Sequence, residues 1–307
     1  MNITIEHLTK KYGAQRAVDD ISFEVKKGEI LGFLGPNGAG KTTTMKMITT
    51  YLLPDGGDIS VGGKDVINEA QGVRKLIGYL PEHNPLYTDM PVIDYLAYCA
   101  SLQDVPKDRI PTQVRKMVGV CGLDLEKHKK ISELSKGYRQ RVGLAQAMIH
   151  DPEILILDEP TTGLDPNQIV EIRELIKEIG KEKTVILSTH ILPEVEATCD
   201  RILIINRGKI VADGTADSLR KQSQGKEVLT VTVEDGEAAT VEASLAEVYT
   251  VEAVKALGDN RYEIISLPDL SSKREIFKRV AEQGWIMTEM VASEKKLEDI
   301  FRNLTLN

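Results

Sequence analysis

Hydrophobic and polar positions follow two different periods along the first two-thirds of the chain. Alternation at every second position, or a short run of apolar residues, predicts strands at 3–5, 21–25, 29–34, 58–61, 75–80, 153–158, 184–189, 201–206 and 209–212. Apolar residues spaced three or four positions apart predict helices from 41 to 52–53, from 91 to about 123, and over 136–149 and 167–179. Strands that alternate with helices predict an α/β fold, in which helices cover both faces of a largely parallel sheet.

A polar segment separates this region from a second pattern near the end of the chain. Residues 216–226 contain serine, glycine and several charged residues, and predict a linker. Residues 227–307 then form strand and helix patterns in an order that predicts a small α+β domain with a ferredoxin-like layout. The last predicted helix places Ile300, Phe301 and Leu304 at helical spacing, and this apolar face packs either within its own domain or against a partner.

Composition narrows the class of protein. The chain has 307 residues, of which 41% are hydrophobic, and its formal net charge is −8. Because sequence-independent nucleic-acid binding needs clustered positive charge, we expect no nucleic-acid partner. No apolar run approaches the ~20 residues that span a bilayer, and the N-terminus begins with a strand pattern rather than a secretory signal. Cys99, Cys121 and Cys199 are widely spaced, which predicts reduced thiols rather than a disulfide framework or a zinc site.

The sequence GPNGAGKTT at 35–43 lies between a predicted strand and a predicted helix, and it matches the phosphate-binding pattern GxxxxGK[ST]. Glycines allow several backbone N–H groups to face one anion, and a helix N-terminus favours negative charge. Lys41 is predicted to reach the β- and γ-phosphates, and the Thr42 hydroxyl to bind Mg²⁺. The other nucleotide contacts predicted in this loop are Gly35, Asn37, Gly38, Gly40 and Thr43.

A second candidate motif stands at the end of the apolar strand 153–158. Asp158 is its last residue, at the carboxyl end, where open parallel sheets bind their ligands. A carboxylate at this position can hold Mg²⁺, while the neighbouring Glu159 can take a proton from an attacking water molecule. Together with the phosphate loop, the pair predicts a nucleoside triphosphatase.

Three further motifs follow in order: LSKGYRQR at 134–141, TTGLDP at 161–166 and STH at 188–190. With this set the chain resembles the ABC-type ATPase family, in particular the ATP-binding subunits of ABC-2-type transporters. GYLPEHNPLY at 78–87 is similar to the gliding-motility-associated subunits. The resemblance implies a P-loop NTPase domain over 1–215 with an inserted helical subdomain at about 85–150. It also implies an accessory role for residues 227–307, in dimer contact or regulation.

The resemblance assigns roles to further residues. Tyr12 matches the aromatic residue that stacks on adenine, although a tyrosine alone is more often a packing residue. Ser135 and Gly137 match the signature motif that contacts the γ-phosphate held by the opposite subunit. This motif departs from the commonest form, since Lys136 replaces a glycine and Tyr138 a glutamine.

Three other assignments follow from the same resemblance. Asp165 matches the loop that joins the two sites across a dimer, and His190 matches the histidine that senses the γ-phosphate. A single histidine after a strand is otherwise more often structural. Glu82 stands where the family often has a glutamine that contacts Mg²⁺; it either ligates the metal through its carboxylate or is a solvated loop residue.

The resemblance therefore implies an ATPase that binds ATP and Mg²⁺ and has Glu159, His190 and Lys41 as catalytic residues. Its partners would be a second ATPase subunit, identical or paired, and a multi-span membrane permease that docks on the helical segment 85–130. Its place would be the cytoplasmic face of the inner membrane, as a peripheral subunit. Three alternatives remain open at this stage: a soluble ATPase acting on DNA or ribosomes, a non-catalytic nucleotide-gated scaffold, and a GTPase.

Overall fold

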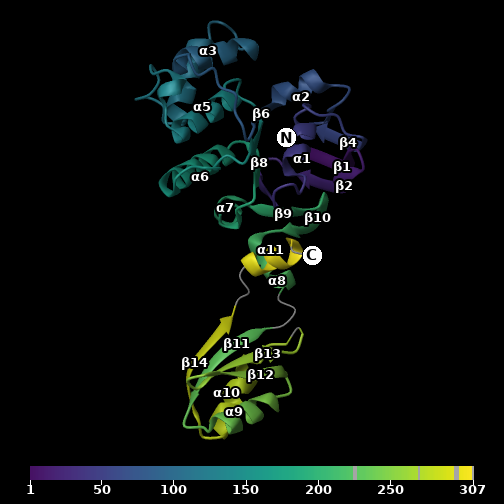
Figure 1. Ribbon diagram of the computed structural model, residues 1–307, viewed down its shortest axis with the longest axis vertical. Coiled ribbons are helices and arrows are strands. Elements are labelled where there is room, and N and C mark those ends of the chain that lie inside the picture. The colour runs from purple at the N-terminus through teal and green to yellow at the C-terminus, as the bar shows by residue number, and fades with distance from the viewer. Residues whose placement is uncertain (224–226, 269, 294–296, 306–307) are drawn as a thin grey trace. The chain divides into compact units, whose positions relative to one another are not determined.

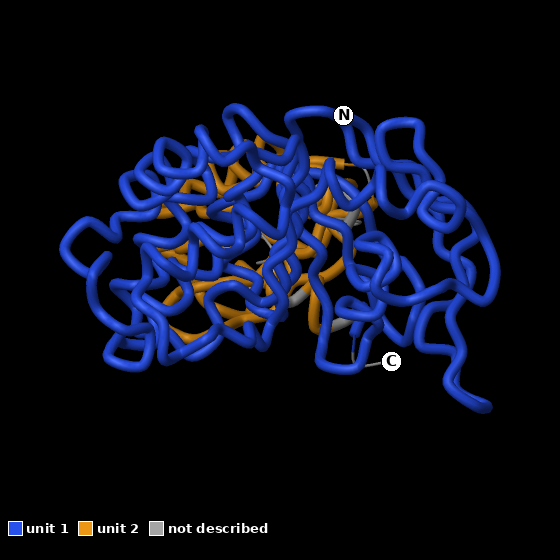
Figure 2. The backbone as a smooth tube through the Cα atoms, turned by 90° about the horizontal axis from the view of Figure 1, so that it is seen from above, with its two compact units in different colours: residues 1–216, 304–307 blue, residues 217–303 orange. Residues whose placement is uncertain are grey.

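The computed structural model describes residues 1–223, 227–268, 270–293 and 297–305. The chain forms two compact units, which are coloured separately in Figure 2. The first contains residues 1–216 and the second residues 217–303. Residues 304 and 305, which the sequence assigns to the C-terminal domain, belong to the first unit. There the Asn206 side-chain amide donates to the carbonyl oxygens of Leu304, at 3.1 Å, and Thr305, at 3.5 Å.

A six-stranded sheet forms the centre of the first unit (Figure 1). Its strand order is β10-β9-β3-β8-β7-β6, and all neighbours are parallel except β9 and β10. The strands are β3 (Ile30–Leu34), β6 (Ile77–Leu80), β7 (Ile154–Asp158), β8 (Thr184–Thr189), β9 (Arg201–Asn206) and β10 (Lys209–Gly214). The largely parallel sheet predicted from the apolar runs is thus present, although the strand expected at 75–80 begins at Ile77 because Lys75 and Leu76 end a helix.

The two faces of this sheet pack into different hydrophobic cores. Successive side chains of a strand point to opposite faces, and β7 shows this directly: Ile154 and Ile156 belong to one core, Leu155 and Leu157 to the other. The first core also contains an antiparallel sheet of order β2-β1-β4-β5. Its strands are β1 (Ile3–Tyr12), β2 (Gln15–Val25), β4 (Gly56–Val61) and β5 (Lys64–Asp65).

The helices of the first unit complete the two cores. They are α1 (Lys41–Ile48), α2 (Ala70–Leu76), α3 (Val92–Leu102), α4 (Ile110–Val120), the 3₁₀ turn η1 (Ile131–Glu133), α5 (Lys136–Met148), α6 (Pro166–Gly180) and α7 (Leu192–Thr198). Helix α1 contributes Met45, Met47 and Ile48 to the core shared with the antiparallel sheet. Helices α3, α4, α5 and α6 pack in the other core, which includes the predicted helical subdomain.

Two predicted helices are shorter than the sequence pattern indicates. Helix α1 ends at Ile48 rather than at 52–53, because Thr50 adopts a left-handed conformation with φ 61°. The single helical stretch expected from 91 to about 123 is two helices, α3 and α4. Asp104 has φ 57°, and Pro106 two residues later lacks an N–H group, so the first helix cannot continue through this segment.

The second unit begins with a helix where the sequence predicts a linker. Helix α8 covers Ala216–Ser223, whereas 224–226 of the predicted linker lie outside the described residues. Then follow β11 (Val228–Glu234), α9 (Ala238–Ala246), β12 (Val251–Gly258), β13 (Arg261–Ser266), α10 (Lys273–Glu282), β14 (Ile286–Ser293) and α11 (Leu297–Thr305). The antiparallel sheet order is β12-β13-β11-β14. This is a β-α-β-β-α-β arrangement, and its assignment to the ferredoxin-like class stays a prediction.

Candidate nucleotide-binding and catalytic site

The phosphate loop leaves β3 and enters α1 at the carboxyl edge of the central sheet. Two glycines are sterically required there. Gly40 has φ 111°, and a Cβ atom at this position would lie 2.4 Å from the carbonyl oxygen of Ala17. A Cβ on Gly35 would lie 2.3 Å from the carbonyl oxygen of Ile205. The glycine pattern of the sequence is therefore dictated by close backbone packing and by a left-handed turn.

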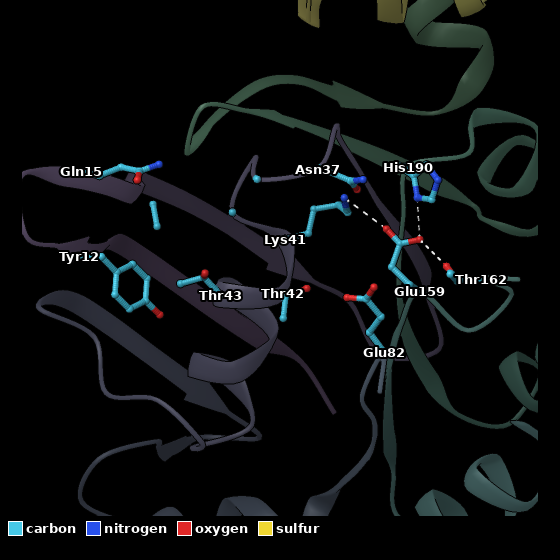
Figure 3. A pocket seen from close by; sticks show the side chains of 13 residues that line it. Tyr12, Gln15, Asn37, Lys41, Thr42, Thr43, Glu82, Glu159, Thr162 and His190 are labelled. Carbon is cyan, nitrogen blue, oxygen red and sulfur yellow. Dashed lines mark hydrogen bonds and ion pairs between the residues drawn. The ribbon is translucent and has the colours of Figure 1, made fainter. Parts of the chain in front are cut away.

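A cavity of about 620 Å³ opens beside this loop (Figure 3). It is lined by residues of the phosphate loop, of β1 and β2, and of the segments that follow β6, β7 and β8: Tyr12, Gln15, Ala17, Asn37, Gly38, Gly40, Lys41, Thr42, Thr43, Glu82, Glu159, Thr162 and His190. The structure thus brings most of the predicted nucleotide-binding residues together around one space. Gln15, Ala17 and Thr162 were not predicted from the sequence.

Lys41 lines the cavity and is buried. Its ammonium group donates to the carbonyl oxygens of Gly35, at 2.8 Å, and Pro36, at 3.2 Å, and it forms an ion pair with Glu159 at 3.3 Å. Both charged side chains are 6% exposed. A buried charge is stable only when it is paired and hydrogen-bonded, so the loop carbonyls and Glu159 together hold the ammonium group in place.

Glu159 is the centre of the polar contacts drawn in Figure 3. Its Oε2 atom lies 2.9 Å from Nδ1 of His190 and accepts from the Thr162 hydroxyl at 3.3 Å. An ionised carboxylate only accepts hydrogen bonds, so in this contact Nδ1 of the imidazole is the donor when it carries the ring proton. His190 comes from the segment after β8 and is 40% exposed, so it does not lie in the core, and its role in sensing a phosphate stays a prediction.

Glu159 also has an unusual backbone. Its φ angle is 50°, in the left-handed region that residues other than glycine rarely adopt. The backbone N–H of Glu159 donates to the carbonyl and hydroxyl oxygens of Ser188, at 3.1 and 3.2 Å. These bonds continue the pairing of β7 with β8 by one residue and direct the carboxylate toward Lys41 and His190.

Asp158 lies one residue earlier and is completely buried. Its Oδ1 atom accepts a short hydrogen bond from the Ser188 hydroxyl, whereas Oδ2 has no hydrogen-bond partner among the described residues. Burial raises the pKa of the Asp158 carboxyl, and hydrogen bonding from Ser188 and Thr42 offsets this only in part. A buried carboxylate oxygen without a donor is suited to a cation.

The residues around Asp158 supply further oxygen ligands. Asp158, Thr42 and Glu82 all line a second cavity of about 390 Å³. A hydroxyl and two carboxylates are the oxygen donors that Mg²⁺ prefers. The three residues predicted to bind the metal are thus near one another, although the exposed Glu82 retains a solvated side. This donor set fits a magnesium ion.

Tyr12 stands at the opposite side of the cavity from Glu159 (Figure 3). Tyr12 is 53% exposed, so it is not a core residue, and its role in stacking on a base stays a prediction. An exposed aromatic ring that lines this cavity offers a π-face on which a base can stack.

Four predicted nucleotide contacts do not line this cavity: Gly35, at the start of the phosphate loop, and Ser135, Gly137 and Asp165. Ser135 caps helix α5 by accepting from the Tyr138 N–H at 3.4 Å, and Asp165 caps α6 by accepting from the Gln168 N–H at 3.0 Å. Gly137 is buried against Gln168, whose amide would lie 2.6 Å from a Cβ atom there. Ser135 and Asp165 are thus bonded within their own helices and Gly137 packs against α6, and none of these three bonds to the phosphate loop in the contacts described.

Comparison with known proteins agrees with this architecture. Residues 18–162 match the model of the ABC transporter family. The chain is 34% identical to the uncharacterized ABC transporter ATP-binding protein YxlF of Bacillus subtilis, over 97% of this chain and 98% of that protein. It is also 34% identical to the bacitracin transport ATP-binding protein BcrA of Bacillus licheniformis, over 97% and 95% of the two chains.

A solved structure described as the ATP-binding subunit of an ABC transporter is 31% identical and superposes with a TM-score of 0.66, covering 73% of this chain and 93% of that chain. The chain therefore belongs to the family of ABC transporter ATP-binding proteins. It is an ABC ATPase, and its relatives include subunits named for export and drug resistance. The similarity to gliding-motility-associated subunits stays a prediction.

Proposed function

We propose that this chain hydrolyses ATP at the site formed by Lys41, Glu159 and His190, and that hydrolysis drives export by a separate membrane protein. One observation carries the proposal. The buried Glu159 carboxylate lies within hydrogen-bonding distance of a lysine and a histidine, in a cavity that begins at the phosphate loop. The arrangement supports the proposal because it would surround a bound γ-phosphate with a proton acceptor and two stabilising groups.

The proposed reaction is attack of water on the γ-phosphorus of ATP. Glu159 accepts a proton from the water as its oxygen bonds to phosphorus, and the bond to the β-phosphate oxygen breaks to give ADP and inorganic phosphate. Lys41 stabilises negative charge on the phosphate oxygens. His190 holds Glu159 through Nδ1 and presents its other ring nitrogen to the phosphate. The alternative of a non-catalytic scaffold is disfavoured because this complete set of groups is in place.

Mg²⁺ would be held by the Thr42 hydroxyl and the Asp158 carboxylate, with Glu82 at the exposed side. The ion supplies charge neutralisation to the bound phosphates. For the chain itself, the consequence is that a cation would satisfy the buried Oδ2 atom of Asp158, which has no donor among the described residues.

The signature residues support a role in a dimer. Ser135 and Asp165 stand at the N-termini of α5 and α6, and neither lines the cavity of its own subunit. We propose that they, with Gly137, complete the nucleotide site of a second ATPase subunit. The cassette named MJ0796, whose solved structure is described as dimeric, has this fold, with 22% identity and a TM-score of 0.64 over 69% of this chain and 98% of that chain.

The membrane-spanning part of such a transporter would be a separate multi-span permease. Among the described residues, no helix is long and apolar enough to cross a bilayer. The helical segment 85–130 is the proposed docking surface, and there Tyr87 is 55% exposed and packs edge-on against the buried Tyr95. The chain would then lie peripherally on the cytoplasmic face of the cell membrane, where ATP is available.

The experiment is an assay of Mg²⁺-dependent ATP hydrolysis by the purified chain and by Lys41→Ala. Loss of the Lys41 ammonium group should weaken ATP binding and reduce kcat/KM by at least ~100-fold. Lys181→Ala is the matched control, because Lys181 is exposed and pairs only with Glu178 in the contacts described. Equal activity of the two variants would refute the proposed site.

A further inference from the structure

Glu194 is a buried carboxylate outside the cavity that has no role in the proposed reaction. It lies at the start of α7, and its side chain is 3% exposed. Oε1 accepts a hydrogen bond from the Thr161 hydroxyl at 2.6 Å, and Oε2 accepts one from the Thr189 hydroxyl at 2.8 Å. Both threonines are buried as well. A buried carboxylate is costly unless its oxygens have donors, so this three-residue contact is a specific construction.

The two threonines belong to the segments that carry the catalytic pair. Thr161 lies two residues after Glu159, and Thr189 directly precedes His190. The Thr189 hydroxyl also accepts a hydrogen bond from the backbone N–H of Ile191. This bond spans His190, because Thr189 and Ile191 are its two neighbours in the chain. One oxygen of the Glu194 carboxylate therefore bonds to the segment that follows β7, and the other bonds to the end of β8.

The segments that carry Glu159 and His190 need further contacts to fix their positions, because the sheet ends here. The parallel pairing of β7 with β8 ends at Asp158 and Ser188, and only the backbone N–H of Glu159 extends it. Glu159 itself has φ 50°, a conformation that persists for a non-glycine residue only when the surrounding structure fixes it. The 2.9 Å contact between Glu159 and His190 thus lies just beyond the sheet, with Glu194 bonded to the residues that flank it.

We propose that Glu194 is a positioning residue, which holds Glu159 and His190 in register through Thr161 and Thr189. The inference rests on the proposed function, because it gives Glu194 a role only through these two residues. Thr161 also begins the turn toward Asp165, since its carbonyl oxygen accepts from the Leu164 N–H at 3.1 Å. Glu194 therefore connects the catalytic pair to the segment that carries Asp165.

The test removes single hydroxyl groups and leaves the carboxylate in place. Thr161→Val and Thr189→Val each keep side-chain shape, and Thr189→Ser restores the hydroxyl. We expect kcat to fall by roughly 10- to 100-fold in the two valine variants, with the KM for ATP unchanged, because misplaced catalytic groups affect the reaction rather than ATP binding. Thr189→Ser should recover kcat to within about threefold of the wild type.

Thr198→Val is the matched control. Thr198 is a buried threonine on the same helix as Glu194, and its hydroxyl has no hydrogen-bond partner within the part of the chain that the structure describes. Its replacement should leave kcat and KM unchanged. Loss of a donor to the buried carboxylate lowers the unfolding midpoint in either case, so kcat decides: a purely structural role for Glu194 would leave kcat of the two valine variants at the wild-type value.

A second measurement separates this inference from the proposed function. In a Glu159→Gln background, Thr189→Val should reduce the single-turnover rate by less than twofold, because the residue that it positions has already lost its function. An equal fold-reduction in both backgrounds would overturn the positioning role. If Glu159→Gln alone left the rate unchanged, the proposed function would fail. If Glu159→Gln were inactive but both valine variants kept full activity, only the role of Glu194 would be refuted.

Discussion

Glu159 and His190 meet at 2.9 Å between Oε2 and Nδ1, although 31 positions separate them in the chain. The contact forms because β7 and β8 are parallel neighbours, so the residues that follow them leave the sheet at the same edge. Lys41 reaches the same carboxylate from α1, which follows β3, the other neighbour of β8. Three segments of one sheet edge therefore supply the three groups of the proposed catalytic site.

Asp158→Asn is predicted to stabilise the protein in the absence of nucleotide and Mg²⁺. Burial raises the pKa of Asp158, so the folded state binds its proton more tightly than the unfolded state does. The contribution of Asp158 to the free energy of unfolding of the wild type therefore falls as the pH rises from the ordinary aspartate pKa of the unfolded state through the raised pKa of the folded state. An asparagine removes the buried charge and still accepts from Ser188.

Denaturant midpoints across this pH range check the prediction. The midpoint of Asp158→Asn should exceed that of the wild type at neutral pH, and the difference should shrink as the pH is lowered. Mg²⁺ with ATP should raise the midpoint of the wild type more than that of the variant. Asp89→Asn, which changes an exposed aspartate, is the control. A lower midpoint for Asp158→Asn at neutral pH would contradict the account.

Gly40→Ala is predicted to disrupt the phosphate loop. The new Cβ would lie 2.4 Å from the Ala17 carbonyl oxygen at φ 111°, and strained backbone of this kind costs about 1–3 kcal/mol. Urea unfolding should show this loss, and ATP binding should weaken. Gly119→Ala is the matched control, since this helical glycine has no atom near its Cβ position and a normal φ. It should gain about 0.5–1 kcal/mol. Equal effects at the two glycines would mean that the loop tolerates a Cβ.

Tyr12→Ala is predicted to raise the KM for ATP by roughly 5- to 100-fold, because stacking of a base on an aromatic ring contributes ~1–3 kcal/mol. The kcat should change little, since Tyr12 lies at the side of the cavity away from Glu159. Tyr12→Phe keeps the ring and should behave as the wild type. Tyr249→Ala removes a comparably exposed tyrosine from the other unit as a control. An unchanged KM in Tyr12→Ala would exclude stacking.

Much of this site could be predicted from sequence because its residues are adjacent to strong strand patterns. The loop 35–43 follows an apolar strand, and Asp158 and Glu159 stand at the end of another. The hydrophobic pattern therefore locates the strand ends, and the motifs identify the residues that lie there. The boundaries of α1 and of the helices after residue 91 were harder to predict from the sequence. They depend on positive φ angles at Thr50 and Asp104, which the hydrophobic pattern does not encode.

Residues whose role depends on contacts across the sheet were missed. Glu194 meets Thr161, 33 positions earlier in the chain, only through folding. Thr162 bonds to Glu159 three residues before it, but it matches no phosphate-loop pattern. The one signal for Glu194 in the sequence is a carboxylate four residues after His190, in a short helix whose other buried members are Leu192, Val195 and Thr198. An acidic residue on a buried helix face requires a donor, which is a reason to search for one.

The central claim is that Glu159 accepts the proton during ATP hydrolysis, and single-turnover kinetics of Glu159→Gln test it most directly. Glutamine keeps the shape of the side chain but cannot accept the proton, so the rate of hydrolysis should fall by roughly 10²–10⁴-fold while ATP binding is retained. The variant should also accumulate an ATP-bound dimer. Glu182→Gln, the same change at an exposed position, should keep the wild-type rate. A Glu159→Gln protein that hydrolyses bound ATP as fast as the wild type would contradict the account.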